Sequence, residues 1–201
     1  MNECHVALAV EDELSAAVMY RLIQETGRNF VVSQFLNARG FGQLKSGMGK
    51  FRNASHALPH IVLTDLDRYP CPPALLVEWG ASALPARMLF RIAVREVEAW
   101  LLADRSGIAD FLGVAKNKVP YDPEAEADPK LCLINLARNG RRKRLAIEIV
   151  PEVGSAASIG PLYNKRLSEF VGGAWNVASA RLTSPSLDRA LSRLSLFMLA
   201  P

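Results

Sequence analysis

The sequence predicts an α/β fold: a parallel sheet of about four strands flanked by helices, with a helical C-terminal extension. In the first half of the chain, short apolar segments alternate with segments of helical periodicity, which is the pattern of β–α repeats around a buried parallel sheet. After Gly113 every periodic segment is helical. The chain has 201 residues, of which 50% are hydrophobic and 22% charged, so it is large enough to bury a core.

Four short apolar segments are the predicted strands. Each is rich in Val, Ile, Leu or Phe, as expected for strands that are covered on both faces. They span residues 5–10, 30–35, 60–64 and 88–94. A helical segment follows each of them, so consecutive strands are joined by crossovers and run parallel.

The segments between these strands are predicted helices. After the first strand, Leu14, Val18 and Leu22 recur at helical spacing, and Gly27 ends the helix. Residues 37–59 are rich in glycine and basic side chains, and we expect a loop with a short helix there. That short helix is predicted at 43–53, and the other helices of this half at 74–79 and 95–104.

The second half of the chain is predicted to be helical. An acidic, proline-bearing connector at 120–129 precedes helices at 131–138, 144–150, 161–171 and 184–199. The last helix has the strongest signal, because Ser184 is a good N-cap and Pro185 suits the first helical position. We therefore divide the chain into an α/β core, residues 1–114, and a helical extension packed on that core, residues 115–201.

Composition narrows the classes of function. The net charge of +4 is mildly basic and permits a nucleic-acid partner. The three cysteines form no Cys-x-x-Cys pair, which is typical of reduced thiols in the cytoplasm. No apolar run approaches the length of a membrane span, and no leader-like segment opens the sequence. We expect a cytoplasmic protein with no membrane partner.

Acidic side chains follow three of the four predicted strands. Glu11 ends the first strand, Asp65 and Asp67 end the third, and Glu96 and Glu98 follow the fourth. Parallel strands deliver their carboxyl ends to one edge of the sheet, where open α/β sheets bind ligands. Carboxylates that lie close together repel unless a cation separates them, and Mg²⁺ or Mn²⁺ prefers such oxygen ligands. The alternative is structural, because acidic residues after strands also cap the following helices.

These residues resemble known families. The strand end at Glu11, the Asp65-Leu-Asp67 pair and the β–α alternation resemble the Toprim domain of topoisomerases, primases and overcoming-lysogenization-defect nucleases. More narrowly, nearly the whole chain is similar to a bacterial family catalogued as a domain of unknown function and associated with Toprim-like folds and neighbouring ATPase genes. The motifs of that similarity are Val10-Glu-Asp-Glu-Leu-Ser15, Arg95-Glu-Val-Glu-Ala-Trp-Leu-Leu-Ala-Asp104, Gly160-Pro-Leu-Tyr-Asn164 and Ser184-Pro-Ser-Leu187.

The Toprim resemblance implies roles for three residues. Glu11 matches the Toprim glutamate, a general acid/base or metal ligand, and Asp65 and Asp67 match its metal-binding pair. Glu96 and Glu98 have no Toprim counterpart, and we add them as candidate ligands because of their place at the same edge. Asp12 departs from the family pattern, since a glycine usually follows the Toprim glutamate.

Three groups of basic residues are candidates for binding a phosphate backbone. The densest is the run from 138 to 144; the others lie in the glycine-rich loop and near residue 165. The alternative for such a run is a solvated surface. The candidate side chains are Lys45, Lys50, Arg141, Arg142, Lys143, Arg144 and Lys165.

Two functional hypotheses follow. The first is a Mg²⁺- or Mn²⁺-dependent phosphoryl-transfer enzyme, most simply a Toprim-type nuclease that acts on DNA or RNA within an ATPase-associated defence system. Its catalytic residues would be Glu11, Asp65 and Asp67. The second is a non-catalytic docking subunit of an ATPase, in which the acidic residues are helix caps and the helix at 184–199 offers its apolar stripe to the partner.

Overall fold

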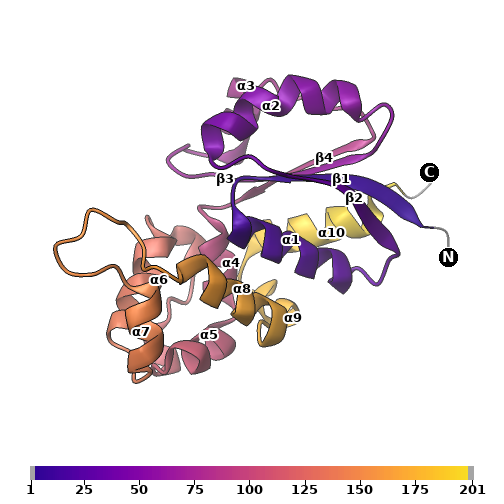
Figure 1. Ribbon diagram of the computed structural model, residues 1–201. Coiled ribbons are helices and arrows are strands. Elements are labelled where there is room, and N and C mark those ends of the chain that lie inside the picture. Colours follow the sequence, from indigo (N-terminus) through magenta and orange to yellow (C-terminus); the bar gives the residue numbers. More distant parts are fainter. Residues whose placement is uncertain (1–2, 199–201) are drawn as a thin grey trace.

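The computed structural model of the protein describes residues 3–198 and confirms the predicted fold class. Four parallel strands form one sheet in the order β2-β1-β3-β4 (Figure 1). The strands are β1 (Cys4–Val10), β2 (Phe30–Asn37), β3 (His60–Asp65) and β4 (Met88–Ala93). Each predicted strand is present, and their boundaries differ from the prediction by at most two residues at either end.

Strand register places the carboxyl ends of the strands at one edge of the sheet. Asp65 of β3 pairs with Ala93 of β4, and Ala9 of β1 pairs with Val62 of β3. The residues that follow β1, β3 and β4 therefore leave the sheet side by side. We call this edge the acidic rim, after Glu11, Asp65, Asp67, Glu96 and Glu98.

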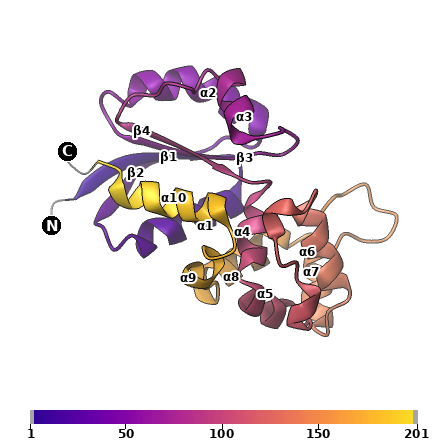
Figure 2. The ribbon, with the colours of Figure 1, turned by 180° about the vertical axis from the view of Figure 1, so that it is seen from behind.

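Helices cover both faces of the sheet. Helices α1 (Glu13–Glu25) and α10 (Pro185–Leu196) lie on one face, and α2 (Phe41–Ala54) and α3 (Pro72–Glu78) lie on the other (Figures 1 and 2). Successive side chains of a strand point to opposite faces. Leu8 and Leu63 accordingly belong to the core beneath α1 and α10, whereas Ala9 and Val62 belong to the core beneath α2 and α3.

The remaining helices form a lobe beyond the acidic rim (Figure 1). Its contact with the sheet layer includes a hydrogen bond of 2.8 Å from Arg21 Nη1 on α1 to the carbonyl oxygen of Val171. The lobe consists of α4 (Val97–Ala103), α5 (Arg105–Leu112), α6 (Pro129–Arg138), α7 (Lys143–Ile149), α8 (Tyr163–Gly173), α9 (Val177–Ala180) and two 3₁₀ turns, Lys116–Lys118 and Pro123–Ala125.

The structure corrects the helix predictions at three places. The short helix predicted at 43–53 is present but longer, as α2 spans Phe41–Ala54, because Leu44, Met48 and Phe51 give it a buried stripe. The predicted helix at 95–104 ends at Ala103, and α5 follows, because the Asp104 carboxylate accepts a hydrogen bond of 3.1 Å from the N–H of Gly107 and so caps a new helix. The predicted Ser184 cap is confirmed, but the last helix ends at Leu196 and not at residue 199, because the backbone becomes extended at Phe197.

No helix within residues 3–198 combines the length and the apolar character needed to cross a membrane.

Candidate functional site

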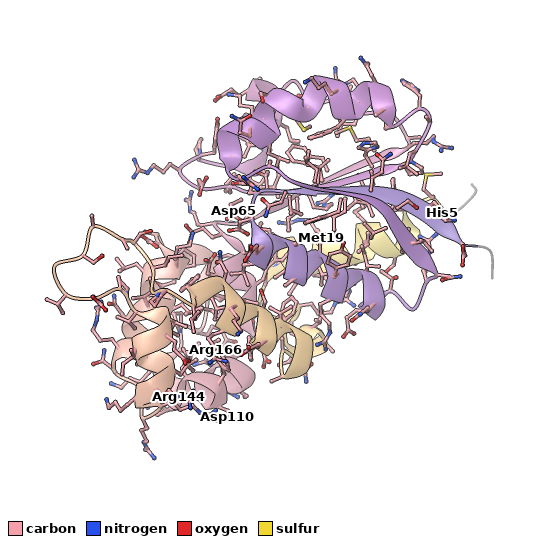
Figure 3. The ribbon with its side chains drawn as sticks, in the orientation of Figure 1. His5, Met19, Asp65, Asp110, Arg144 and Arg166 are labelled. Carbon is pink, nitrogen blue, oxygen red and sulfur yellow. The ribbon has the colours of Figure 1, made fainter. Side chains whose placement is uncertain are left out.

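The acidic rim is a cluster of carboxyl groups at the junction of the sheet and the helical lobe. Figure 3 labels Asp65 at this junction. The pKa of each of the five carboxyl groups is raised, in every case first by burial. Repulsion between neighbours adds to this: Asp65 is affected by Glu98 and Glu11, and Glu96 by Asp67. The structure therefore brings the five predicted carboxylates into one electrostatic cluster.

Glu11 is held by the end of the neighbouring strand. The hydroxyl of Thr64 donates a hydrogen bond to Glu11 Oε1, and the N–H of Asp65 donates another to the same oxygen over 3.0 Å. Burial raises the pKa of Glu11, and these two hydrogen bonds partly offset the rise. The other oxygen, Oε2, accepts no hydrogen bond from the described residues. Glu11 thus presents one oxygen to the rim in a fixed orientation.

Asp65 is partly buried and links β3 to the start of α4. Its Oδ1 accepts a hydrogen bond of 3.0 Å from the N–H of Val97, the first residue of that helix. Burial raises its pKa well above the usual range, and the nearby Glu98 and Glu11 raise it further. A buried carboxyl group among other carboxyl groups is stable as an anion only when positive charge lies close to it.

Asp67 lies beside Asp65 at the surface of the rim. Its backbone is left-handed, with φ of 49°, and its N–H donates a hydrogen bond of 2.9 Å to the carbonyl oxygen of Arg95. Aspartate tolerates this conformation better than most residues. Partial burial raises the pKa of Asp67, and its carboxylate has no hydrogen-bond or ion-pair partner within residues 3–198. Its oxygens are free to bind a ligand.

A lysine from the helical lobe enters the cluster. Lys130 Nζ lies 3.8 Å from Glu96 Oε1 and 3.6 Å from Glu98 Oε1. The N–H of Lys130 also donates a hydrogen bond of 2.9 Å to Glu96 Oε2, so Glu96 caps the start of α6. Burial alone would lower the pKa of Lys130, but Glu98, Glu96 and Asp65 together outweigh this and raise it. Lys130 is therefore a cation fixed among the rim carboxylates.

Glu98 is the most deeply buried carboxyl group of the rim, with 2% of its side chain exposed. Burial raises its pKa to about 7, although Lys130 opposes the rise. The hydroxyl of Tyr163 on α8 donates a hydrogen bond of 2.9 Å to Glu98 Oε1. The second oxygen, Oε2, is buried without a hydrogen-bond partner. Such an unpaired buried oxygen is rare in native proteins and marks a position where an additional cation or proton would be stabilising.

Sequence reasoning missed Lys130 and Tyr163. The helix dipole disfavours a lysine in the first turn of a helix. The position of Lys130 in the first turn of α6 was therefore the one sequence signal that it has an acidic partner. Tyr163 lies in the Gly160-Pro-Leu-Tyr-Asn164 motif, which the sequence analysis quoted without assigning the tyrosine a role. Both residues reach the rim only because the helical lobe folds back against it.

The rim suits a hard divalent cation in ligand type. Glu11 Oε2, the second oxygen of Asp65 and the carboxylate of Asp67 remain without protein partners among the described residues, and such oxygens are the ligands Mg²⁺ and Mn²⁺ prefer. Within residues 3–198, however, no three His, Cys, Asp or Glu side chains are already arranged to hold a metal ion. Binding would therefore require side-chain rotation at the rim.

Two surface hollows give access to the rim. One, of about 600 Å³, is lined by Glu11, Asp12, Arg39 and Asn164, and the other, of about 500 Å³, by Asp67, Arg68, Arg95 and Glu96 among others. A third hollow of about 750 Å³ lies along α6 and includes none of the five carboxylates. We place the candidate site at the first two, because the titratable groups face them and not the largest hollow.

The predicted basic residues do not gather at the rim. Arg141, Arg142, Lys143 and Arg144 are exposed at the start of α7, and Figure 3 labels Arg144 at the far end of the helical lobe from Asp65. Lys45 and Lys50 lie on α2, and Lys45 pairs with Glu78 over 2.5 Å. Lys165 is exposed on α8.

Comparison of the chain with protein-family models, with curated proteins and with solved structures gave no match.

Proposed function

We propose that the protein is a metal-dependent phosphoryl-transfer enzyme, most simply a Toprim-type nuclease that uses Mg²⁺ or Mn²⁺ bound by Glu11, Asp65 and Asp67. The observation that supports this most is the convergence of five wholly or partly buried carboxyl groups from the ends of three strands. Lys130 carries one positive charge among five carboxyl groups, so holding these groups together as anions still costs free energy. A divalent cation that also binds phosphate oxygens would offset that cost and explain why the groups lie at one edge.

The hydrogen bonds of the rim argue against a purely structural role as helix caps. Asp12, not Glu11, caps α1, because its Oδ1 accepts a hydrogen bond of 2.8 Å from the N–H of Ser15. Asp65 does bond to the start of α4, but Asp67 bonds to no helix. Helix capping therefore accounts for Asp65 and Glu96 but not for Asp67, nor for Glu11, whose hydrogen bonds go to the end of β3.

The residues of the rim have distinct tasks in this proposal. A bound metal ion would activate water and neutralise charge on the phosphoryl group. Thr64 and the Asp65 N–H hold Glu11 Oε1, so that the free oxygen of Glu11 is available as a ligand of the metal ion. The Lys130 ammonium stabilises negative charge that develops on phosphate oxygens. Tyr163 holds Glu98, which in turn keeps Lys130 in place.

The alternative role, docking to an ATPase, rested on an apolar stripe of the last helix. In the structure Leu187, Leu191 and Leu194 of α10 are buried in the core beneath the sheet. This stripe is therefore not available to a partner chain, and no other observation favours the docking role.

Cleavage of supercoiled plasmid and of labelled RNA in Mn²⁺ tests the proposal. The key variant is Asp67→Asn, because the Asp67 carboxylate makes no contact that the fold needs. We expect the wild type to cleave, Asp67→Asn and Asp65→Ala to be inactive, and Asp122→Asn, an exposed acid outside the rim, to cleave like the wild type. Wild-type rates in Asp67→Asn, or no cleavage by the wild type on either substrate, would contradict it.

A further inference from the structure

Three arginines lie together along the open edge of the sheet. Arg91 is on β4, the edge strand, and Arg189 and Arg193 are on α10. Leu89 and Ala93 belong to the core on the α10 side of the sheet. Because every second residue of a strand faces the same side, Arg91 faces the α10 side as well. Arg189 and Arg193 are exposed and stand one helical turn apart on one face of α10. We call these three residues the edge arginines.

The edge arginines lack acidic partners. None of them forms an ion pair within residues 3–198, whereas Arg21, Arg166 and Arg181 are each paired with a carboxylate. The Nε atom of Arg91 is buried and has no hydrogen-bond partner. Burial lowers the pKa of Arg91, and repulsion from the positive charges of Arg193 and Arg189 lowers it further. An anionic ligand bound at these side chains would relieve this repulsion.

The edge arginines lead away from the acidic rim. Ser186, at the start of α10, accepts hydrogen bonds from the N–H of Val94 over 3.2 Å and from Trp100 Nε1 over 2.7 Å, which fixes the helix start beside the end of β4. The helix then runs back along β4, because Phe197 at its other end lines a hollow together with Met88 and Leu89. Arg91 lies two residues from the rim, and Arg189 and Arg193 follow along the helix.

An apolar hollow adjoins these charges. It has a volume of about 690 Å³ and is lined by Arg193 and by mostly apolar residues, among them Leu84, Leu89 and Leu196. Single-stranded nucleic acid needs both features, since its phosphates bind cations and its bases bind apolar surfaces. This combination favours a nucleic-acid strand over a purely charged ligand such as an acidic peptide.

We infer that the edge arginines bind the phosphate backbone of a nucleic-acid strand that passes from the acidic rim along β4. This inference rests on the proposed function, because it assigns the substrate of the same site. It differs from the sequence-based prediction, which placed backbone binding at the basic run of residues 141–144. That run, marked by Arg144 in Figure 3, lies at the far end of the helical lobe from Asp65. The edge arginines begin at Arg91, two residues before Ala93, the strand partner of Asp65.

Fluorescence anisotropy with a labelled single strand of about twenty nucleotides tests the inference. EDTA in the buffer prevents cleavage, and salt is varied between about 50 and 200 mM, where phosphate contacts dominate the salt dependence. The variant is Arg189→Gln with Arg193→Gln, and both side chains are exposed, so the fold should persist. The matched control is Arg141→Gln with Arg142→Gln, which removes the same charge from exposed positions in the basic run.

Loss of two phosphate contacts should weaken binding about tenfold at the lowest salt and reduce the slope of log affinity against log salt by about 1.4. The control should bind within about twofold of the wild type. Wild-type affinity and slope in the Arg189/Arg193 variant would overturn the inference. Equal losses in both variants would also overturn it, since binding would then follow net charge and not this edge.

Binding and cleavage separate the two proposals. If Asp67→Asn abolishes cleavage while the Arg189/Arg193 variant binds like the wild type, the nuclease proposal is upheld, and the edge arginines do not bind its substrate. If the Arg189/Arg193 variant loses binding but the wild type cleaves neither plasmid nor RNA, the binding edge stands and the nuclease proposal fails.

Discussion

Replacing Lys130 by methionine should destabilise the protein in a pH-dependent way. Methionine keeps most of the length and apolar stem of lysine but removes the ammonium group. Lys130 Nζ lies 3.6 Å from Glu98 Oε1 and 3.8 Å from Glu96 Oε1. Without it, the buried Glu98 and Asp65 lose the nearest positive charge that lowers their pKa values. The carboxyl groups must then stay protonated or be ionised without compensation.

The magnitude follows from this geometry. At an effective dielectric constant of about 20, two unit charges at 3.6 Å attract by about 4–5 kcal/mol. The Lys130 side chain is 33% exposed, so water screens part of this attraction. We expect a loss of about 3 kcal/mol in the free energy of unfolding at alkaline pH, the lower end of the range for breaking a buried pair. For a domain of this size, that corresponds to a fall in melting temperature of about 6–12 °C.

The pH dependence is fixed by the direction of the Glu98 shift. Its pKa is about 7 in the folded protein, against 4.5 for an ordinary glutamate. A carboxyl group with a raised folded-state pKa contributes stability that is fully present below the unfolded pKa and is lost as the pH rises through the folded pKa. Removing Lys130 raises the folded pKa further. The deficit of the variant should therefore be small near pH 5 and larger at pH 8.5, about 1.5 units above the wild-type pKa of Glu98, where Glu98 alone contributes about 2 kcal/mol of it.

Urea unfolding of the metal-free protein in EDTA at these two pH values measures the effect. Lys130→Arg keeps the charge and should recover most of the lost stability, while Lys118→Met removes an exposed lysine and should change little. An equal deficit at both pH values would mean that the variant loses packing and not charge compensation. No deficit at pH 8.5 would refute the assignment of Lys130 as the counter-ion of the rim.

Two further predictions concern single contacts. Thr64→Val removes the hydroxyl that orients Glu11, so initial rates of Mn²⁺-dependent cleavage should fall at least tenfold. Urea unfolding should show a loss of only about 1 kcal/mol in the free energy of unfolding. A wild-type rate of cleavage would show that Glu11 needs no such support. Gly140→Ala places a Cβ 2.2 Å from the carbonyl oxygen of Leu112 and should lower the free energy of unfolding by more than about 2 kcal/mol. In Gly172→Ala, within α8, the added Cβ meets nothing within 4 Å, so this variant should gain up to about 1 kcal/mol. Equal melting temperatures for the two variants would contradict the packing at Gly140.

The sheet and its acidic rim could be predicted because their signals are local in the sequence. A buried parallel strand needs an apolar run, and residues 60–64 supply one that ends directly at Asp65. Once the strands are known to be parallel, their carboxyl ends must share an edge, and Glu11 and Asp65 follow without knowledge of side-chain contacts. The order β2-β1-β3-β4 places β1 beside β3, and this brings Glu11 next to Asp65.

Residues that reach the rim through tertiary packing could not be predicted. Lys130 and Tyr163 are 32 and 65 positions beyond Glu98, and nothing in their local sequence indicates which side chain they meet. The same holds for the edge arginines, since Arg91 and Arg189 are separated by almost half the chain. The run at 141–144 was conspicuous because its charges are adjacent in sequence, yet the structure places it away from the rim.

The contacts of the rim also bear on how the helical extension relates to the α/β core. Glu96 caps α6, Tyr163 of α8 holds Glu98, and α10 covers one face of the sheet, so residues beyond 114 take part in both the site and the core. Lys130 matters most for the site, because it brings a positive charge from the extension to the carboxylates of the core. A charge cluster of this kind is stable only when the fold brings its counter-ion, and here the extension supplies it. Assembly of the site is therefore coupled to docking of the extension.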